Sequence, residues 1–324
     1  MRAITIRDYG DPEVLTLEEV ADPVPGPDEI LVRVHHSAVN RADTLQRRGA
    51  YPDPVRRSVE IPGLEYAGVV AAVGERVSEW SVGDAVMGIE SGACYAEYLV
   101  THERQAMPIP ESLPMADAAA VPEVFLTAWD ALVVQGGLTS GRWALVHAGA
   151  SGVGTAAIQI AKAIGARIAV TCSSPKMSAC SVLGADLVIE RSPNDWAAEL
   201  SGALPGGVDV VLDVIGGDEA DRNLAVVRRE GTIMQVGLMG GGRTPVNLGL
   251  LLTKRIQWVG TTLRSRPLEA KIALCQRFIA EVLPLFDAGG LTPVIDSRFA
   301  LADAAAAHRH MEADANIGKI LLDL

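Results

Sequence analysis

A glycine-rich turn in the stretch LVHAGASGVGTAAIQIAKAIGA contains the first residues whose types and spacing could do chemistry. Gly149, Gly152 and Gly154 are spaced as G-x-x-G-x-G, whereas the familiar phosphate-binding pattern is G-x-G-x-x-G. If Gly149 opens the turn, Ser151 takes the middle position, and a helix begins at about Val153. These five residues, at the positive end of that helix, could then hold a pyrophosphate. Because glycine-rich turns also end ordinary strands, the turn alone is weak evidence for a dinucleotide site.

The segments that must position this turn alternate between strand and helix signals. Apolar runs separated by stretches that can be helical begin near residues 143, 167, 186, 208, 231 and 256. Such alternation predicts right-handed crossovers and a parallel sheet, and six strands are what a doubly wound dinucleotide fold requires. We therefore expect an α/β chain with a six-stranded parallel Rossmann domain over residues 124–266.

The segments on either side of this domain predict a second, β-rich domain. The first hundred residues contain short β-branched runs separated by turn signals such as PGPDE and SVGD. After about Pro267 the pattern predicts a helix, a strand, a second helix and a terminal strand. We therefore expect a discontinuous domain over residues 1–123 and 267–324, with the nucleotide domain inserted between its two parts.

The end of the second predicted strand bears on which dinucleotide would bind. An NAD site usually places Asp or Glu there, on the ribose 2′-hydroxyl. No carboxylate lies between Arg167 and Leu183, and Ser173, Ser174 and Lys176 stand at that place instead. Hydroxyls and an ammonium suit a 2′-phosphate, which favours NADPH. The alternative is that the serines only cap the next helix.

Composition restricts the partners and the compartment. The chain carries 28 Lys and Arg against 40 Asp and Glu, a net charge of −12, which argues against a nucleic-acid or anionic-membrane surface. It has no run of about 18 apolar residues, and its N-terminus is unlike a signal peptide. Four scattered cysteines fit reduced thiols better than a disulfide framework. We expect a cytoplasmic protein that acts on a small molecule.

Motifs over essentially the whole length resemble the medium-chain dehydrogenase/reductase superfamily. They are SAVNRADTLQRRGAYP, IPGLEYAGVV, VGDAVMG, YAEY, IPE, AAAVPEVFLTAWDAL, HAGASGVGTAAIQIAKAIGA, GLMGGG, LRSR and NIGKI. Within the superfamily the chain is most similar to the zinc-free, zeta-crystallin-like quinone oxidoreductases, and among them to the stress-inducible NADPH quinone oxidoreductases. The resemblance implies a GroES-like catalytic domain for the β-rich part and an NADPH-binding Rossmann domain.

The resemblance also indicates that no zinc binds. Zinc-dependent relatives place a Cys ligand at the position of Asn40 and a His ligand at Leu64. No Cys or His lies between Asp117 and His147 to supply a third ligand, and the structural zinc lobe has only Cys94 where four cysteines are needed. A tetrahedral zinc site cannot be assembled from these residues, so we expect no metal.

The remaining histidines do not supply a metal site either. His35 and His36 are adjacent on a predicted strand and face opposite ways, while His308 and His310 belong to a predicted surface helix. Structural or solvated roles are expected for all four.

The resemblance implies which residues contact substrate and cofactor. Asn40, Gln46 and Tyr51 match catalytic positions in a cleft over the nicotinamide, between the domains. Asn40 could hydrogen-bond the carboxamide or a quinone oxygen; Tyr51 could stack on the quinone, donate a hydrogen bond, or simply pack. Arg191 matches a position near the adenine, where relatives often carry an aromatic residue and where a guanidinium could stack. Family cofactor contacts match Asn40, Thr127, Gly216, Leu238, Met239, Leu263 and Asn316.

Three functions are compatible with this pattern. The leading hypothesis is an NADPH-dependent quinone oxidoreductase, because a quinone accepts hydride without a Lewis acid and asks mainly for positioning. The alternative is an NADPH-dependent reductase of activated C=C bonds, such as 2-alkenals or enoyl thioesters, for which Tyr51 is the only nearby proton donor. A third is a non-catalytic NADPH-binding protein.

Two further expectations concern the surface. The segment RRGAYPDPVRR places Arg47, Arg48, Arg56 and Arg57 near the expected mouth of the cleft, where a solvated loop is the simplest interpretation. The resemblance implies a homodimer, with a tetramer as the alternative, formed through the last strand of the nucleotide sheet. That strand, RIQWVGTTL, is apolar enough to need a covered edge.

Overall fold

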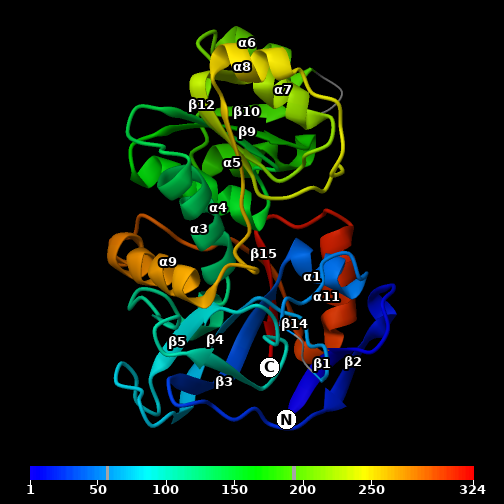
Figure 1. Cartoon of the computed structure of the whole chain (residues 1–324), viewed down its shortest axis with the longest axis vertical. Helices are drawn as coiled ribbons and strands as arrows, with labels where there is room; N and C mark the ends of the chain where they lie inside the picture. The colour runs from blue at the N-terminus through cyan, green and yellow to red at the C-terminus, as the bar shows by residue number, and fades with distance from the viewer. Residues whose placement is uncertain (56–57, 192–194) are drawn as a thin grey trace. The chain divides into compact units, whose positions relative to one another are not determined.

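The structure is a computed structural model that describes residues 1–55, 58–191 and 195–324 (Figure 1). Arg56 and Arg57, two of the arginines expected near the cleft mouth, lie outside the described residues. Within the described part of the chain, no helix combines the length and the apolar character that crossing a bilayer would require.

The described residues form two compact units. Unit 1 contains Met1–Leu126 and Leu263–Leu324, and unit 2 contains Thr127–Thr262. The first unit is discontinuous in sequence, with the second inserted between its two segments.

Unit 2 is built on a six-stranded parallel sheet in the order β10-β9-β8-β11-β12-β13. Its strands are β8 (Trp143–His147), β9 (Arg167–Cys172), β10 (Leu187–Glu190), β11 (Val208–Asp213), β12 (Val227–Gln235) and β13 (Gln257–Gly260). These are the six predicted apolar runs, because strands covered on both faces need apolar side chains throughout. The chain reverses direction across the sheet between β8 and β11, which confirms the doubly wound fold and defines its switch point.

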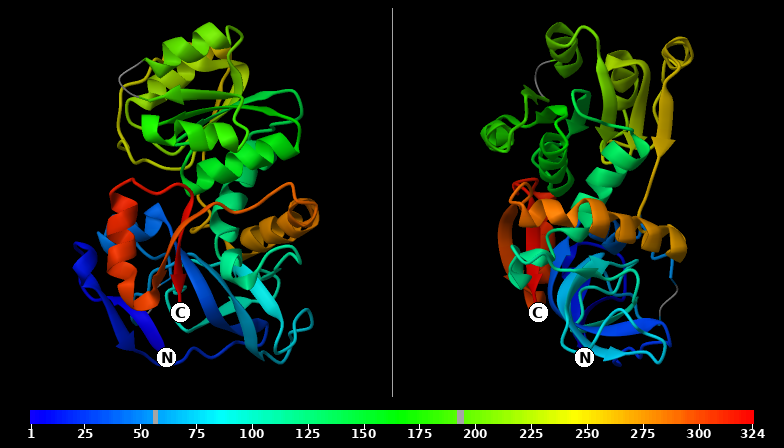
Figure 2. Two further views of the ribbon diagram at one scale, coloured as in Figure 1. Left: turned by 180° about the vertical axis from the view of Figure 1, so that it is seen from behind. Right: turned by 90° about the vertical axis from the view of Figure 1, so that its left-hand side faces the viewer.

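Helices cover both faces of this sheet (Figure 2). On one face, Trp196 of α6, Leu224 of α7 and Leu251 of α8 pack on strand residues such as Val211 and Ile233. Right-handed crossovers place α4 and α5 on the other face. The helical segments are α3 (Pro122–Trp129), its π-helical continuation η2 (Asp130–Gln135), α4 (Gly152–Ala163), η3 (Ser174–Lys176), α5 (Met177–Val182), α6 (Trp196–Ala203), α7 (Glu219–Val226) and α8 (Leu248–Lys254).

Unit 1 contains a seven-stranded sheet and a separate two-stranded sheet, which confirms the predicted β-rich domain. The large sheet has the order β14-β15-β3-β4-β5-β7, with β6 also paired to β3, and only β14 and β15 are parallel among its described strands. The strands are β1 (Arg2–Ile6), β2 (Leu15–Glu19), β3 (Glu29–Val39), β4 (Glu65–Val73), β5 (Ala85–Ile89), β6 (Tyr98–His102), β7 (Met107–Pro108), β14 (Ile295–Ala300) and β15 (Lys319–Asp323).

The two chain segments of unit 1 are joined by strand pairing and by a helix. Strand β15 pairs antiparallel with β3, with Ile320 opposite Val39. Helix α11 packs Ala304 and Met311 against Ile4 of β1 in the same apolar cluster. The helical segments are η1 (Pro12–Val14), α1 (Arg41–Arg47), α2 (Met115–Ala118), α9 (Leu268–Glu281), α10 (Leu283–Asp287), η4 (Leu301–Asp303) and α11 (Ala304–Glu312).

Two glycines in the turn after β8 are required because other atoms pack where a side chain would begin. A Cβ at Gly149 would lie 2.6 Å from the Cβ of Val170, and one at Gly154 would lie 2.4 Å from the carbonyl oxygen of Ala148. Ser151 is the N-cap of α4, and its Oγ accepts a hydrogen bond of 3.0 Å from the N–H of Gly154. The hydroxyl proton of Ser151 therefore stays available to a ligand.

We expect Gly154→Ala to lower the free energy of unfolding by about 1–3 kcal/mol, because the added methyl group meets backbone atoms that cannot move aside. The control is Gly202→Ala in α6, where a Cβ meets nothing within 4 Å and where alanine should be neutral or stabilise by up to about 1 kcal/mol. Urea unfolding of both variants measures the difference. Equal effects would contradict the steric account of the turn.

Candidate functional site

The residues predicted for the site fall into two groups, one in each unit. Unit 1 holds Asn40, Gln46, Tyr51, Leu263 and Asn316, and the other predicted residues belong to unit 2. Leu263 and Asn316 are buried, and the Nδ2 of Asn316 donates to the carbonyl of Gly318 at 2.8 Å.

Asn40 lies at a buried ion pair that joins β4 to β15. The Nζ of Lys319 lies 2.6 Å from Oε1 of Glu65, and both side chains are almost fully buried. Asn40 bridges the pair, since its Nδ2 donates to Oε1 of Glu65 at 2.8 Å and its Oδ1 accepts from Lys319 at 2.7 Å. Sequence reasoning did not identify the charged partners, although both lie in quoted motifs, IPGLEYAGVV and NIGKI.

The donor set around Asn40 does not fit a catalytic zinc. Zinc-dependent relatives carry ligands at the positions of Asn40 and Leu64. Here the Asn40 side chain is hydrogen-bonded to Glu65 and Lys319, and Leu64 has no atom that could bind a metal. The ammonium of Lys319 supplies positive charge here and would repel a divalent cation. No group of three or more His, Cys, Asp or Glu residues suited to a metal occurs among residues 1–55, 58–191 and 195–324.

A second buried network adjoins this ion pair through Asp43. Its Oδ2 accepts from the N–H of Asn40 at 2.8 Å and from the hydroxyl of Tyr95 at 3.0 Å. Burial raises the pKa of Asp43 to about 6. The Tyr95 oxygen also lies 3.3 Å from Nε2 of His308, whose pKa burial lowers to about 3, so this imidazole is neutral at pH 7.

The solvated-loop prediction for Arg47 is wrong at this network, and His308 is more buried than a surface helix suggests. His308 is fully buried on the inner face of α11 with Ala304, Ala307 and Met311, so its role is structural, which is one of the two roles expected for it. Arg47, expected in a solvated loop, is also fully buried and lies 2.6 Å from Glu312. His310 is partly exposed and lies 2.7 Å from Asp296.

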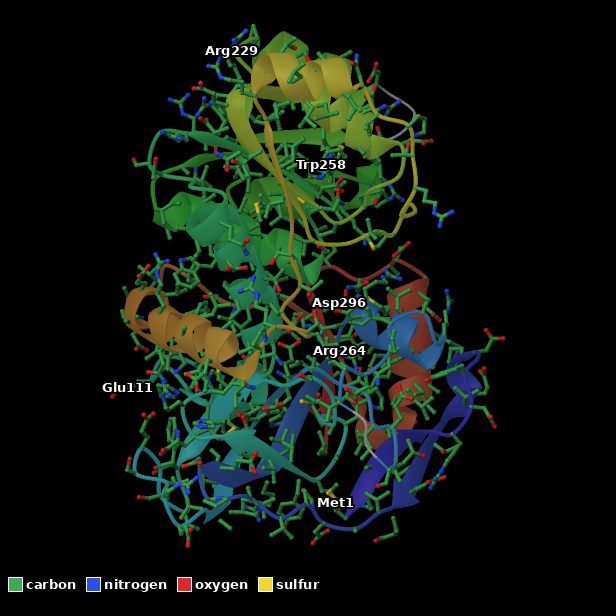
Figure 3. The ribbon with its side chains drawn as sticks, viewed as in Figure 1. Met1, Glu111, Arg229, Trp258, Arg264 and Asp296 are labelled. Carbon is green, nitrogen blue, oxygen red and sulfur yellow. The ribbon has the colours of Figure 1, made fainter. Side chains whose placement is uncertain are left out.

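Gln46 and Tyr51 meet around Arg264, which is labelled in Figure 3 and is 4% exposed. The guanidinium donates to Oε1 of Gln46 at 2.7 Å and to the carbonyl of Tyr51 at 2.9 Å. Its central carbon lies 5.0 Å from the centroid of the Tyr51 ring, a cation–π contact that covers one ring face. The sequence analysis did not predict Arg264 as a site residue, although it lies in the quoted motif LRSR.

Glu123, at the start of α3, is a second candidate acid besides Tyr51. Its backbone N–H donates to Oε2 of Glu65 at 2.8 Å. Burial, and then the charge of Glu65, raise the pKa of Glu123 to about 8, so its carboxyl group is mostly protonated at pH 7. Burial also raises the pKa of the Tyr51 phenol. The prediction that Tyr51 is the only nearby proton donor is therefore incomplete.

The predicted residues of unit 2 gather at the carboxyl ends of its strands. Open α/β sheets bind ligands at this edge, near the switch point. Thr127 is the exception, because it lies within α3. The others follow β8 (Gly149, Ser151, Gly152, Val153, Gly154), β9 (Ser173, Ser174, Lys176), β10 (Arg191), β11 (Gly216) and β12 (Leu238, Met239).

The loops after β9, β11 and β12 keep several of these residues accessible. Ser173 is the N-cap residue of η3, yet its side chain makes no capping hydrogen bond, which weakens the alternative that the serines only cap a helix. Gly216 has a φ of +66°, a conformation that favours glycine. Leu238 and Met239 are 57% and 48% exposed, so both side chains are accessible to a ligand.

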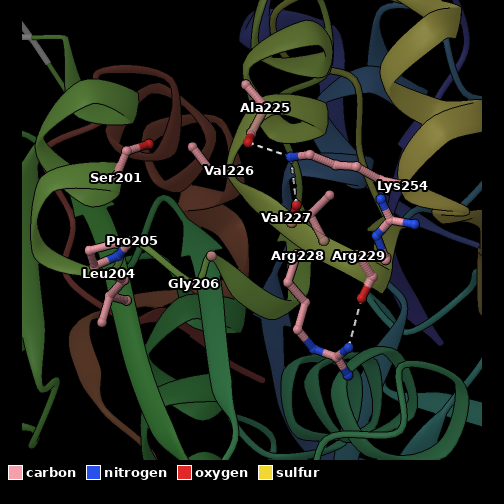
Figure 4. A pocket seen from close by; sticks show the side chains of 11 residues that line it. Ser201, Leu204, Pro205, Gly206, Ala225, Val226, Val227, Arg228, Arg229 and Lys254 are labelled. Atoms are coloured by element: carbon pink, nitrogen blue, oxygen red, sulfur yellow. Dashed lines mark hydrogen bonds between the residues drawn. The ribbon is translucent and has the colours of Figure 1, made fainter.

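A cavity of about 270 Å³ in unit 2 lies at the opposite edge of the sheet (Figure 4). It is lined by residues at the amino ends of β11 and β12. The Nζ of Lys254 donates to the carbonyls of Leu224, Ala225 and Val227 at 2.6–3.0 Å, and Nε of Arg228 lies 2.5 Å from Asp209. These cations are already engaged, and the position is wrong for the predicted dinucleotide.

Family models match both units. The model for the alcohol dehydrogenase GroES-like domain matches residues 26–111, and the model for zinc-binding dehydrogenases matches residues 152–279. Among curated proteins, the quinone oxidoreductase of Lama guanicoe is 31% identical over 99% of this chain and 97% of its own length. The synaptic vesicle membrane protein VAT-1 homolog of Rattus norvegicus is 29% identical over 99% of this chain and 84% of its own length.

Solved structures of a quinone oxidoreductase and of an enoyl reductase are also similar to this chain. Escherichia coli quinone oxidoreductase complexed with NADPH superposes with a TM-score of 0.91 at 28% identity and covers 100% of both chains. The JamJ enoyl reductase in its apo form has a TM-score of 0.91 at 25% identity, covering 99% of this chain and 98% of that chain.

We expect Lys319→Met to lower the free energy of unfolding by about 3–5 kcal/mol, because it leaves the Glu65 carboxylate buried without its partner. Adding Glu65→Gln should recover part of the loss. The control is Lys162→Met, which removes an exposed ion pair with Asp186 and should have an effect below about 1 kcal/mol. Urea unfolding measures all three; similar losses for both lysine variants would contradict the special role of the buried pair.

We expect Glu123 to make the protein less stable as pH rises from about 5 to 8. In that window the folded chain keeps the proton on Glu123, whose pKa is about 8, while the unfolded chain has lost it. Glu123→Gln mimics the neutral acid, so its unfolding free energy should decline less over this range. Denaturant unfolding at several pH values tests this, and parallel curves for both proteins would contradict the raised pKa.

Proposed function

Because this chain belongs to the quinone oxidoreductase family of the medium-chain dehydrogenase/reductase superfamily, we propose that it reduces a quinone by zinc-independent hydride transfer from NADPH. Membership makes the chain an oxidoreductase of this family. The observation that carries the finer proposal is the end of β9, where two serines and a lysine replace the carboxylate of an NAD site.

The residues at the strand ends of unit 2 fit a dinucleotide. Gly149 and Gly154 let the backbone approach closely, and the free hydroxyl proton of Ser151 can donate to phosphate. Ser173, Ser174 and Lys176 would bind the 2′-phosphate, and Arg191 would lie along the adenine. When bound, NADPH supplies the hydride through its nicotinamide ring.

The substrate contacts in this proposal come from unit 1. Arg264 fixes Tyr51 at its carbonyl and covers one ring face, so a quinone would stack on the other face. Asn40 is held between Glu65 and Lys319, and the fully buried Gln46 is held between Arg264 and Glu60, so both amides would support the site around Tyr51 through these contacts. A hydroquinone anion is delocalised and takes its proton from water, so this reaction needs positioning more than a dedicated acid.

A second candidate function is the reduction of activated C=C bonds. Such a reaction leaves an enolate that needs a proton, and the neutral carboxyl group of Glu123 is a donor that quinone reduction does not require. The similarity to the JamJ enoyl reductase supports this alternative.

A homodimer and a cytoplasmic location belong to the same proposal. Strand β13 is the edge of its sheet, and its half-buried Trp258 and Val259 are suited to pairing with a second copy (Trp258 is labelled in Figure 3). All four cysteines are buried and form no disulfide, which suits a reducing compartment.

We expect the purified chain to oxidise NADPH with 1,2- or 1,4-quinones more efficiently than with 2-alkenals, and to prefer NADPH over NADH. Lys176→Ala should reduce that cofactor preference by about 10- to 100-fold, since it removes a charge-assisted contact worth about 1.5–3 kcal/mol. Tyr51→Phe should leave quinone turnover within about threefold if the ring only stacks. Steady-state kcat/KM for each pair of substrates measures these effects.

The other outcomes separate the alternatives. Faster turnover of 2-alkenals, lost in Glu123→Gln, would favour C=C reduction. Equal efficiency with NADH and NADPH, or a Lys176→Ala variant with unchanged preference, would contradict the 2′-phosphate assignment. No oxidation of NADPH with any quinone or enal, despite binding, would favour a non-catalytic NADPH-binding protein.

A further inference from the structure

A line of buried hydrogen bonds runs beneath the strand ends of unit 2. The Oγ1 of Thr171 lies 2.8 Å from Nδ1 of His147, and Nε2 of His147 lies 2.8 Å from Oδ1 of Asn223. The Nδ2 of Asn223 donates to Oδ2 of Asp213 at 3.0 Å. All four side chains are at most 3% exposed. The line joins β9, β8, α7 and β11 across the switch point of the sheet.

For a neutral His147 imidazole, chemistry fixes the direction of every hydrogen bond in this line. A carboxylate only accepts, so Asn223 must turn its amide nitrogen to Asp213 and its oxygen to His147. His147 therefore carries its proton on Nε2, and its Nδ1 accepts from the hydroxyl of Thr171. Each inner polar atom has a partner of the right kind, as a buried network requires.

The carboxylate end of the line holds a loop of the candidate cofactor site. Oδ1 of Asp213 accepts from the N–H groups of Ile215 and Gly216 at 2.7 and 2.9 Å. The carbonyl of Ile215 in turn accepts from the N–H of Gly240 at 2.7 Å, within the loop that carries Leu238. One buried line thus positions backbone after both β11 and β12.

The placement of these polar residues indicates a role beyond folding. Strands β8, β9 and β11 are apolar along most of their length, and His147, Thr171 and Asp213 stand at or next to their carboxyl ends. Apolar residues of similar volume would fill this space without the desolvation penalty of a buried carboxylate. The polar line lies at the strand ends, where the loops after β11 and β12 must keep fixed positions relative to each other.

We infer that Asn223 and His147 are positioning residues for the cofactor, acting through Asp213 on the loops that carry Gly216, Leu238 and Met239. This inference rests on the proposed function, because it assumes that a nicotinamide dinucleotide binds at these loops. Neither residue needs to touch the cofactor. Because the line ends at loops that every such dinucleotide would use, its loss should weaken NADPH and NADH alike.

The test is Asn223→Leu in the full chain, with the Kd of NADPH and of NADH measured by fluorescence titration. The leucine leaves Oδ2 of Asp213 and Nε2 of His147 without partners. We expect both Kd values to rise about tenfold or more, as affinity falls when residues that orient the ligands of a metal site are replaced. Lys176→Ala should instead weaken NADPH selectively.

The matched control is Leu224→Ala, in the same helix and equally buried. It should lower the unfolding midpoint through lost packing and leave both Kd values within about twofold. If Asn223→Leu lowers the midpoint but leaves Kd unchanged, or if Leu224→Ala raises Kd as much, the inference is overturned. If the wild-type chain binds neither cofactor, the proposed function fails first.

A milder pair of variants applies if Asn223→Leu does not fold. Thr171→Val removes only the hydroxyl that donates to His147, and Thr232→Val is its control in β12 of the same sheet. We expect a measurable rise in both Kd values for the first and none for the second. Nitrogen NMR of His147 should show the Nε2-protonated tautomer in the wild type, and the opposite tautomer would overturn the assigned direction.

Discussion

The ion pair between Glu65 and Lys319 is the constraint on which unit 1 depends. Two charges are removed from water there, so each must be met by fixed partners. Both carboxylate oxygens of Glu65 have partners. Its Oε1 accepts from Lys319 and Asn40, and its Oε2 accepts from the N–H of Glu123 at the start of α3. The position of Asn40 and the environment of Glu123 therefore follow from one buried carboxylate.

The same ammonium distinguishes this site chemically from that of its zinc-dependent relatives. A divalent ion has open coordination positions and polarises a substrate oxygen, whereas the Lys319 ammonium has its protons committed to Val39, Asn40 and Glu65. It neutralises charge and holds geometry, but it has no capacity left to act on a substrate. The proposed reduction of a quinone, an acceptor that is already reactive, asks for no such polarisation.

The sequence predicts the backbone better than the side-chain pairs. Apolar runs located the six strands of unit 2, and glycine spacing located Gly149 and Gly154, because both signals are local in the sequence. The partners of Glu65 and of Arg264 lie far away in sequence, 254 residues in the first case and 218 in the second, and no local pattern encodes them. The burial of His308 was not predicted, because two of its three neighbours on the buried face of α11 are alanines, which give little hydrophobic contrast.

The pairing of β15 with β3 also has a consequence for the order in which the chain acquires structure during synthesis. All of unit 2 emerges from the ribosome before β15 does, and it is a compact unit with its own sheet, so it can fold while translation continues. Glu65, made 254 residues earlier than Lys319, must wait for its counter-charge. Until then the nascent unit 1 exposes the end of β3 that pairs with β15 and a carboxylate without its partner, and a chaperone would have most to protect at this stage.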